Sequence, residues 1–159
     1  GYGAPLFGPG GNTPAGSSLG AFGGISSYDG PQGPLVGVFL DDGVPSGAAP
    51  AGLNFTPAGL GIDFESLSPQ LGQVFYIGDG KTSGGVFQSF IAPTGATRLA
   101  LGVPDGFGFG GVPGAYDDND GSYRIRISVN EVPAIPEPGT YALMALGLAA
   151  LSFAARRRG

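Results

Sequence analysis

The sequence has 159 residues, the usual size of one domain, and it contains 33 Gly, 15 Pro and 42% hydrophobic residues. It has no Cys, His or Trp, which excludes thiol nucleophiles, imidazole bases, disulfides and zinc sites built on nitrogen or sulfur ligands. Residues 1–135 carry 4 basic and 11 acidic side chains, and this net charge of −7 argues against a nucleic-acid partner.

Short apolar runs bounded by turn-forming residues predict an all-β fold, because the many Gly and Pro residues disfavour helix interiors. The predicted strands are 35–40, 74–77, 86–91, 98–103 and 123–129. In the last of these, Tyr123, Ile125, Ile127 and Val129 alternate with polar residues, as in a strand with one buried face. We therefore expect an antiparallel β-sandwich or jelly roll, followed by a C-terminal hydrophobic helix.

Composition shifts along the chain divide it into four predicted segments. These are a loosely ordered N-terminal segment 1–25, a β-sandwich domain 26–132, a Pro-rich linker 133–139 and a transmembrane tail 140–158.

Acidic residues concentrate in one loop after the predicted strand 98–103. Asp105 precedes the glycine-rich stretch 106–111, which we expect to be a flexible or extended loop, and Asp117, Asp118, Asn119 and Asp120 follow it. Calcium takes about 6 to 8 oxygen ligands, and this loop can supply several of them. An EF-hand is excluded, since its alignment places Ile127 where a bidentate Glu belongs. The alternative is that these residues simply form tight turns.

Two other carboxylate groups, Asp41 with Asp42 and Asp63 with Glu65, have the composition of a glycosidase pair. Acidic residues beside Gly and Pro are more often solvated loop positions. We therefore predict no catalytic residue and expect the protein not to be an enzyme.

The C-terminal stretch 140–155 runs for 16 residues without a charge. At about 1.5 Å per residue, a helix of this length spans roughly 24 Å, which is short for a membrane span. Pro residues precede it and the three arginines 156–158 follow it, which predicts a body outside the membrane and a C-terminus inside. The alternative is a buried core helix of a globular domain.

The order of these features resembles the PEP-CTERM sorting signal of Gram-negative bacteria. The residues that carry the resemblance are Pro136, Glu137, Pro138, Arg156, Arg157 and Arg158. The resemblance implies export, transient anchoring in the inner membrane, and processing near the Pro-Glu-Pro by an exosortase, with the cell surface or extracellular matrix as destination. Export requires an N-terminal signal, which we expect to have been removed or to lie outside this sequence.

A second resemblance concerns the acidic loop. The string from Val112 to Tyr123, together with the segment 28–33, is similar to the calcium-binding motifs of the galactophilic bacterial lectins of the PA-I type, a β-sandwich family. The resemblance implies a Ca²⁺ site formed by the carbonyls of Tyr28 and Ala115 and the side chains of Asp105, Asp118 and Asn119. It also implies a carbohydrate ligand, although the histidine with which these lectins hold the sugar has no counterpart here.

Our leading hypothesis is an exported surface or matrix protein with a calcium-stabilised β-sandwich that binds carbohydrate. One alternative is a structural matrix or filament subunit, a homo-oligomer whose strand edges pair between molecules. Another is an enzyme that acts on polysaccharide.

Overall fold

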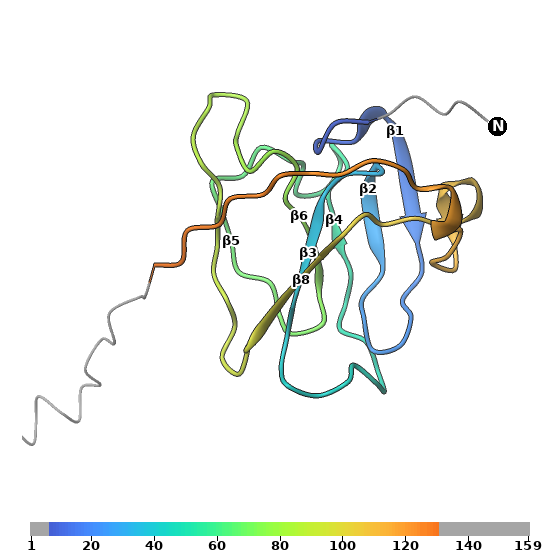
Figure 1. Cartoon of the computed structure of the whole chain (residues 1–159), viewed down its shortest axis with the longest axis vertical. Helices are drawn as coiled ribbons and strands as arrows, with labels where there is room; N and C mark the ends of the chain where they lie inside the picture. The colour runs from blue at the N-terminus through green and yellow to red at the C-terminus, as the bar shows by residue number, and fades with distance from the viewer. Residues whose placement is uncertain (1–6, 131–159) are drawn as a thin grey trace, which may run out of the picture. The chain divides into compact units, whose positions relative to one another are not determined.

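The structure is a computed structural model that describes residues 7–130, and the chain divides into two units, Gly1–Tyr123 and Arg124–Gly159. The described strands are β1 (Asn12–Leu19), β2 (Tyr28–Gln32), β3 (Val36–Leu40), β4 (Leu53–Asn54), β5 (Ser66–Leu67), β6 (Val74–Tyr76), β7 (Ser89–Phe90), β8 (Arg98–Gly102) and β9 (Gly110–Gly111) (Figure 1). Two 3₁₀ turns, η1 (Phe107–Phe109) and η2 (Tyr116–Asp118), lie in the loop after β8. The predicted all-β class is confirmed.

The strands form three sheets, with the orders β4-β2-β1-β9, β6-β3-β8 and β5-β7. The longest pairings, β1 with β2 and β3 with β6 and β8, are antiparallel as expected. The two-residue strands β9, β4 and β7 instead pair in parallel with β1, β2 and β5. The prediction of antiparallel pairing therefore holds for the longer strands and not for these three short pairs.

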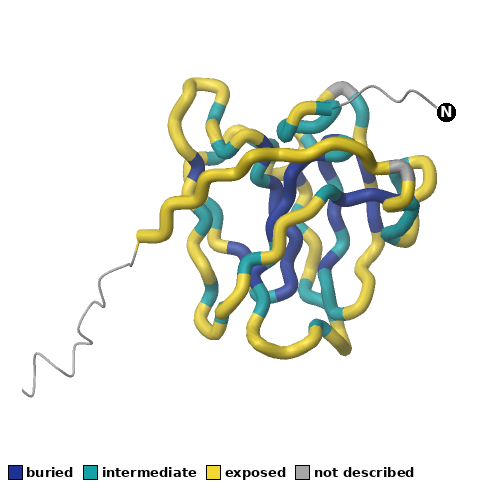
Figure 2. Tube along the Cα trace, in the orientation of Figure 1, coloured by how far each residue is buried: buried dark blue, intermediate teal, exposed yellow. Residues whose placement is uncertain are grey.

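Apolar sequence explains the central sheet. β3 and β6 are rich in Val and Phe, which suit a strand covered on both faces. Phe75 is fully buried. Its ring stacks on Phe39 at a centroid distance of 5.1 Å and lies tilted against Phe90 at a centroid distance of 5.0 Å. Figure 2 shows the buried positions gathered on the inner strands, while most connecting loops are exposed.

Three predicted strands are found at β3, β6 and β8, and the predicted strand 86–91 is reduced to the two residues of β7. The prediction that 1–25 is loosely ordered is wrong for Asn12–Leu19, which forms β1. The strand lacks an alternating apolar pattern, and it forms because it pairs with β2 over most of its length.

The predicted strand 123–129 is absent: residues 121–130 have no regular secondary structure and are exposed. Alternation of apolar residues identifies a face that can be buried, but a strand also requires a hydrogen-bonded neighbour. Within residues 7–130, this segment has none.

No helix in the described part of the chain has the length and apolar character that a membrane crossing requires. The predicted C-terminal hydrophobic helix, the linker 133–139 and the tail 140–158 lie outside the described residues.

Candidate functional site

Asp105 is the centre of the acidic loop. Its side chain is only 8% exposed, and its Oδ1 accepts a hydrogen bond of 2.7 Å from the Gly106 amide. Its Oδ2 accepts a hydrogen bond of 2.8 Å from Nδ2 of Asn119, 14 residues further along the chain. Its backbone carbonyl accepts the Gly114 amide at 3.0 Å. The side chain and the backbone carbonyl of Asp105 therefore accept three hydrogen bonds from the loop.

The glycine-rich stretch 106–111 is folded and not simply extended: it forms η1 and then β9, which pairs with β1 at Ser18 and Leu19. Gly106 permits this close approach. A Cβ there would lie 2.8 Å from Cδ2 of Leu19 and 3.0 Å from the Val112 carbonyl oxygen. The absence of a side chain at Gly106 thus allows the residue after Asp105 to lie close to Leu19 of β1.

Ala115 precedes η2 in the left-handed backbone region, with φ 59° and ψ 31°. A residue with a Cβ adopts this conformation at an energetic cost, and such positions concentrate at ligand sites and switches. Asp118 is the last residue of η2, and its side chain lies outside what the structure describes. Asn119 follows in an extended conformation and returns to Asp105.

Tyr28, the first residue of β2, is 2% exposed, and its hydroxyl donates a hydrogen bond of 3.1 Å to the Pro31 carbonyl. Burial raises the pKa of this hydroxyl well above its ordinary value, with smaller contributions from Tyr76 and Asp29. The hydroxyl is engaged with the Pro31 carbonyl, and the candidate metal ligand is the backbone carbonyl of Tyr28.

The structure brings Asp105 and Asn119 into direct contact and places Ala115 and Asp118 in the same loop. Tyr28 lines a pocket whose wall also includes Pro104 and Pro113 of that loop. Among residues 7–130, no group of three or more acidic, His or Cys residues is arranged to hold a metal ion. A metal here would depend on amide and carbonyl oxygens beside the carboxylates.

Three other carboxylates accept hydrogen bonds, and those of Asp42 and Asp63 join segments that are far apart in the chain. Asp41 accepts the Gly43 amide, Asp42 accepts the Thr97 hydroxyl, and Asp63 accepts both the amide and the hydroxyl of Ser83. The Ser83 amide and hydroxyl lower the pKa of Asp63. These contacts are structural, and the absence of enzymatic activity stays a prediction.

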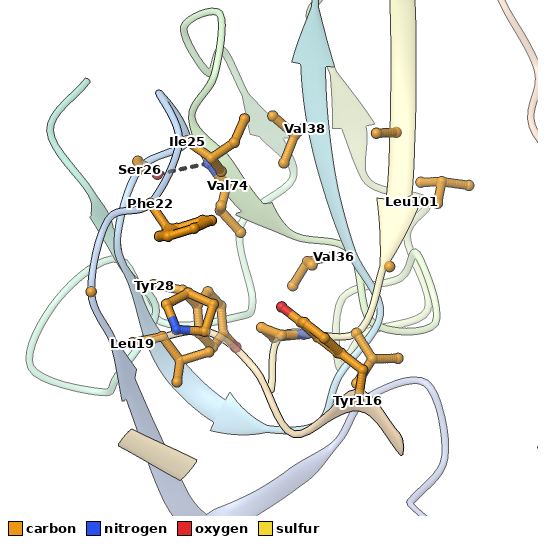
Figure 3. A pocket seen from close by; sticks show the side chains of 16 residues that line it. Leu19, Phe22, Ile25, Ser26, Tyr28, Val36, Val38, Val74, Leu101 and Tyr116 are labelled. Atoms are coloured by element: carbon orange, nitrogen blue, oxygen red, sulfur yellow. Dashed lines mark hydrogen bonds between the residues drawn. The ribbon is translucent and has the colours of Figure 1, made fainter. Parts of the chain in front are cut away.

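Sequence reasoning did not find the pocket itself, which has a volume of about 270 Å³. Its lining comes from β1, β2, β3, β6, β8 and the loops around them, and Figure 3 shows the side chains of Phe22, Tyr28, Val36 and Tyr116 around one space. Residues from segments so far apart in the chain leave no local signal in a sequence.

Comparison with known protein families identifies one segment. Residues 134–158 match the family model of the PEP-CTERM protein-sorting motif. The chain carries a PEP-CTERM sorting motif. The motif indicates an exported surface protein that is processed by an exosortase, a membrane enzyme, and that passes through the membrane on its way to a surface or extracellular location.

The match confirms the sorting motif that the order of Pro136, Glu137 and Pro138, the apolar run and the arginines predicted. No curated protein and no solved structure matches the chain. The comparisons therefore give the resemblance to the galactophilic lectins no support.

Proposed function

We propose that the body of this PEP-CTERM protein binds one calcium ion at the Asp105 loop and uses the bound ion to hold a carbohydrate outside the cell. The observation that carries the proposal is the buried Asp105 carboxylate in contact with Asn119. Both donors to this carboxylate are uncharged amides. Since burying a carboxylate without a cationic partner is unfavourable, a divalent cation at this position would stabilise the loop.

The donor set suits calcium, which prefers oxygen ligands and tolerates irregular geometry. Asn119 now donates through Nδ2, and a half-turn of its amide would present Oδ1 to an ion instead. The carbonyls of Ala115 and Tyr28 and the carboxylate of Asp118 are the further ligands that the lectin resemblance implies.

Carbohydrate is the proposed ligand because a loop calcium with open coordination positions can take two hydroxyls of a sugar. The resemblance to the galactophilic lectins supports this choice of ligand class. The chain has no histidine, so we expect the sugar to be held mainly through the metal.

The direct test is thermal unfolding of the full chain with and without calcium. At a calcium concentration 100 times the dissociation constant, binding should add about 2.7 kcal/mol to the free energy of unfolding. We expect the Asp105→Asn variant to lose this gain, because it keeps the size of the side chain and removes the charge. Asp63→Asn is the matched control, since Asp63 is exposed and bonded to Ser83. An unchanged melting temperature of the wild-type chain in calcium would reject the metal site.

A structural matrix subunit is the second candidate, and one observation favours it. In the unit that begins at Arg124, the side chains of Ile125, Ile127 and Val129 are exposed, Val129 by 86%. An exposed extended segment with alternating apolar side chains can pair with a second molecule. Light scattering should then detect oligomers in the wild-type chain and fewer in the Ile127→Lys variant. Equal masses for the two chains would count against this candidate.

A further inference from the structure

The pocket between β1, β2 and the sheet β6-β3-β8 has a floor of aliphatic side chains. Val38 pairs with Val74 on one side and with Ala100 on the other, so these three side chains lie on the same face of the sheet. Val36 lies two residues before Val38 on this face. All four line the pocket. The floor therefore offers carbon surface and no charge.

The Tyr28 and Ser26 hydroxyls in the lining already have partners within the protein. The Tyr28 hydroxyl donates to the Pro31 carbonyl, and the Ser26 hydroxyl donates to the Ser27 carbonyl at 3.0 Å while it accepts the Val74 amide at 2.9 Å. The side chains that line the pocket include no Asp, Glu, Lys or Arg. An ionic ligand would lose its hydration here without gaining a counter-charge.

Two aromatic side chains border the space. Phe22 is 66% exposed and Tyr116 is 56% exposed. Figure 3 shows them on opposite sides of the pocket, with the Tyr116 hydroxyl pointing toward Val36. This hydroxyl supplies one polar group beside two aromatic faces. Flat rings are the partners that such faces prefer.

The size of the pocket limits its occupant. A dry apolar cavity of about 150 Å³ holds benzene in another protein. The volume here, about 270 Å³, is larger and lies just below the range of roughly 300 to 1,000 Å³ of typical ligand pockets. It suits a molecule of one or two rings, or a ring substituent of a larger molecule.

We propose that this pocket is a binding site for small uncharged ring compounds, held by the aliphatic floor and the Phe22 and Tyr116 rings. The floor and Phe22 lie outside the Asp105 loop, whereas Tyr116 belongs to that loop and Tyr28, a candidate calcium ligand, also lines the pocket. The pocket gives the exported protein a second ligand class besides carbohydrate.

Bromobenzene is a suitable probe because it is a single uncharged ring whose heavy atom quenches tryptophan fluorescence on contact. The chain contains no tryptophan, so Phe22→Trp provides a single reporter at the pocket. Phe87→Trp provides a control reporter at an exposed residue that does not line the pocket. The full chain is used, and the probe is delivered through the vapour phase so that its activity is equal in all samples.

We expect quenching of the Phe22→Trp reporter to saturate and that of the Phe87→Trp reporter to rise linearly. Adding Ala100→Phe to the Phe22→Trp chain fills the floor and should weaken binding by about tenfold or more. Ala48→Phe, at an exposed alanine outside the pocket, should leave binding unchanged.

Linear quenching of both reporters would overturn the proposal, and so would undiminished binding in the folded Ala100→Phe chain. If circular dichroism shows that Ala100→Phe unfolds the domain, Tyr116→Ala decides instead, because it removes a half-exposed ring without overpacking. A severalfold loss of affinity in Tyr116→Ala supports the site, and an unchanged affinity rejects it.

Discussion

At the residue scale, several buried polar groups of the first unit have identified partners, whereas Ser17 Oγ and Gln88 Oε1 have none in the described part of the chain. Asp105 is satisfied by two amides, and Tyr28 by the Pro31 carbonyl. Such groups stabilise a fold only while their partners remain, because an unmatched buried polar atom is costly. The loss of stability caused by a substitution at one of these residues therefore depends on its partner in the fold, which the sequence alone does not reveal.

The Tyr28 hydroxyl gives the domain a dependence on alkaline pH. Burial raises its pKa above the ordinary value of about 10, so the folded state binds this proton more tightly than the unfolded state. The resulting stability is fully present below pH of about 10 and falls as the pH rises further. We expect Tyr28→Phe to lose about 1 kcal/mol at neutral pH and to show a smaller decline above pH of about 10. Urea unfolding of the wild-type and Tyr28→Phe chains from neutral to alkaline pH measures this difference. Equal losses of stability in the two chains above pH of about 10 would contradict the role of the Tyr28 hydroxyl.

At the scale of elements, the sequence predicts a strand well when the strand is buried by its own side chains. β3 and β6 were predicted because Val and Phe dominate them. β1 was missed because its residues, NTPAGSSL, form a strand only through pairing with β2 and β9. The segment 123–129 is the opposite case. It has the alternating pattern of a strand, but it pairs with no neighbouring strand among the described residues.

The short strand β9 depends on Gly106, which allows the loop to approach Leu19. We expect Gly106→Ala to reduce the free energy of unfolding by about 1 to 3 kcal/mol, because its Cβ would press on the buried Leu19 side chain. Gly114→Ala is the control, since a Cβ there meets nothing within 4 Å. Denaturant unfolding measures the stability of both variants. Equal free energies of unfolding for Gly106→Ala and Gly114→Ala would show that the close approach of residue 106 to Leu19 does not stabilise the fold.

At the scale of the whole molecule, location was more predictable than activity. The sorting motif is a local sequence, 25 residues long by its matched range 134–158, and it could be identified without a fold. The lectin resemblance assigns Asp105 and Asn119 to one calcium site, which stays a prediction, and no local pattern predicts the hydrogen bond between these residues, 14 positions apart. The apolar pocket was missed, because tertiary packing alone creates it.

Export connects these features. Outside the cell, calcium reaches the millimolar concentrations at which extracellular modules bind it, with dissociation constants of about 10⁻⁴ to 10⁻³ M. A loop held by one buried carboxylate can therefore be occupied there even if its affinity is modest.

Equilibrium dialysis of the full chain against radioactive calcium measures whether Asp105 holds the proposed ion. At about 1 mM free calcium, dissociation constants of about 10⁻⁴ to 10⁻³ M predict roughly 0.5 to 0.9 bound ion for each wild-type chain, and we predict none for Asp105→Asn. Wild-type chains that bind no calcium, or an Asp105→Asn chain that binds as much as the wild type, would contradict the proposed site.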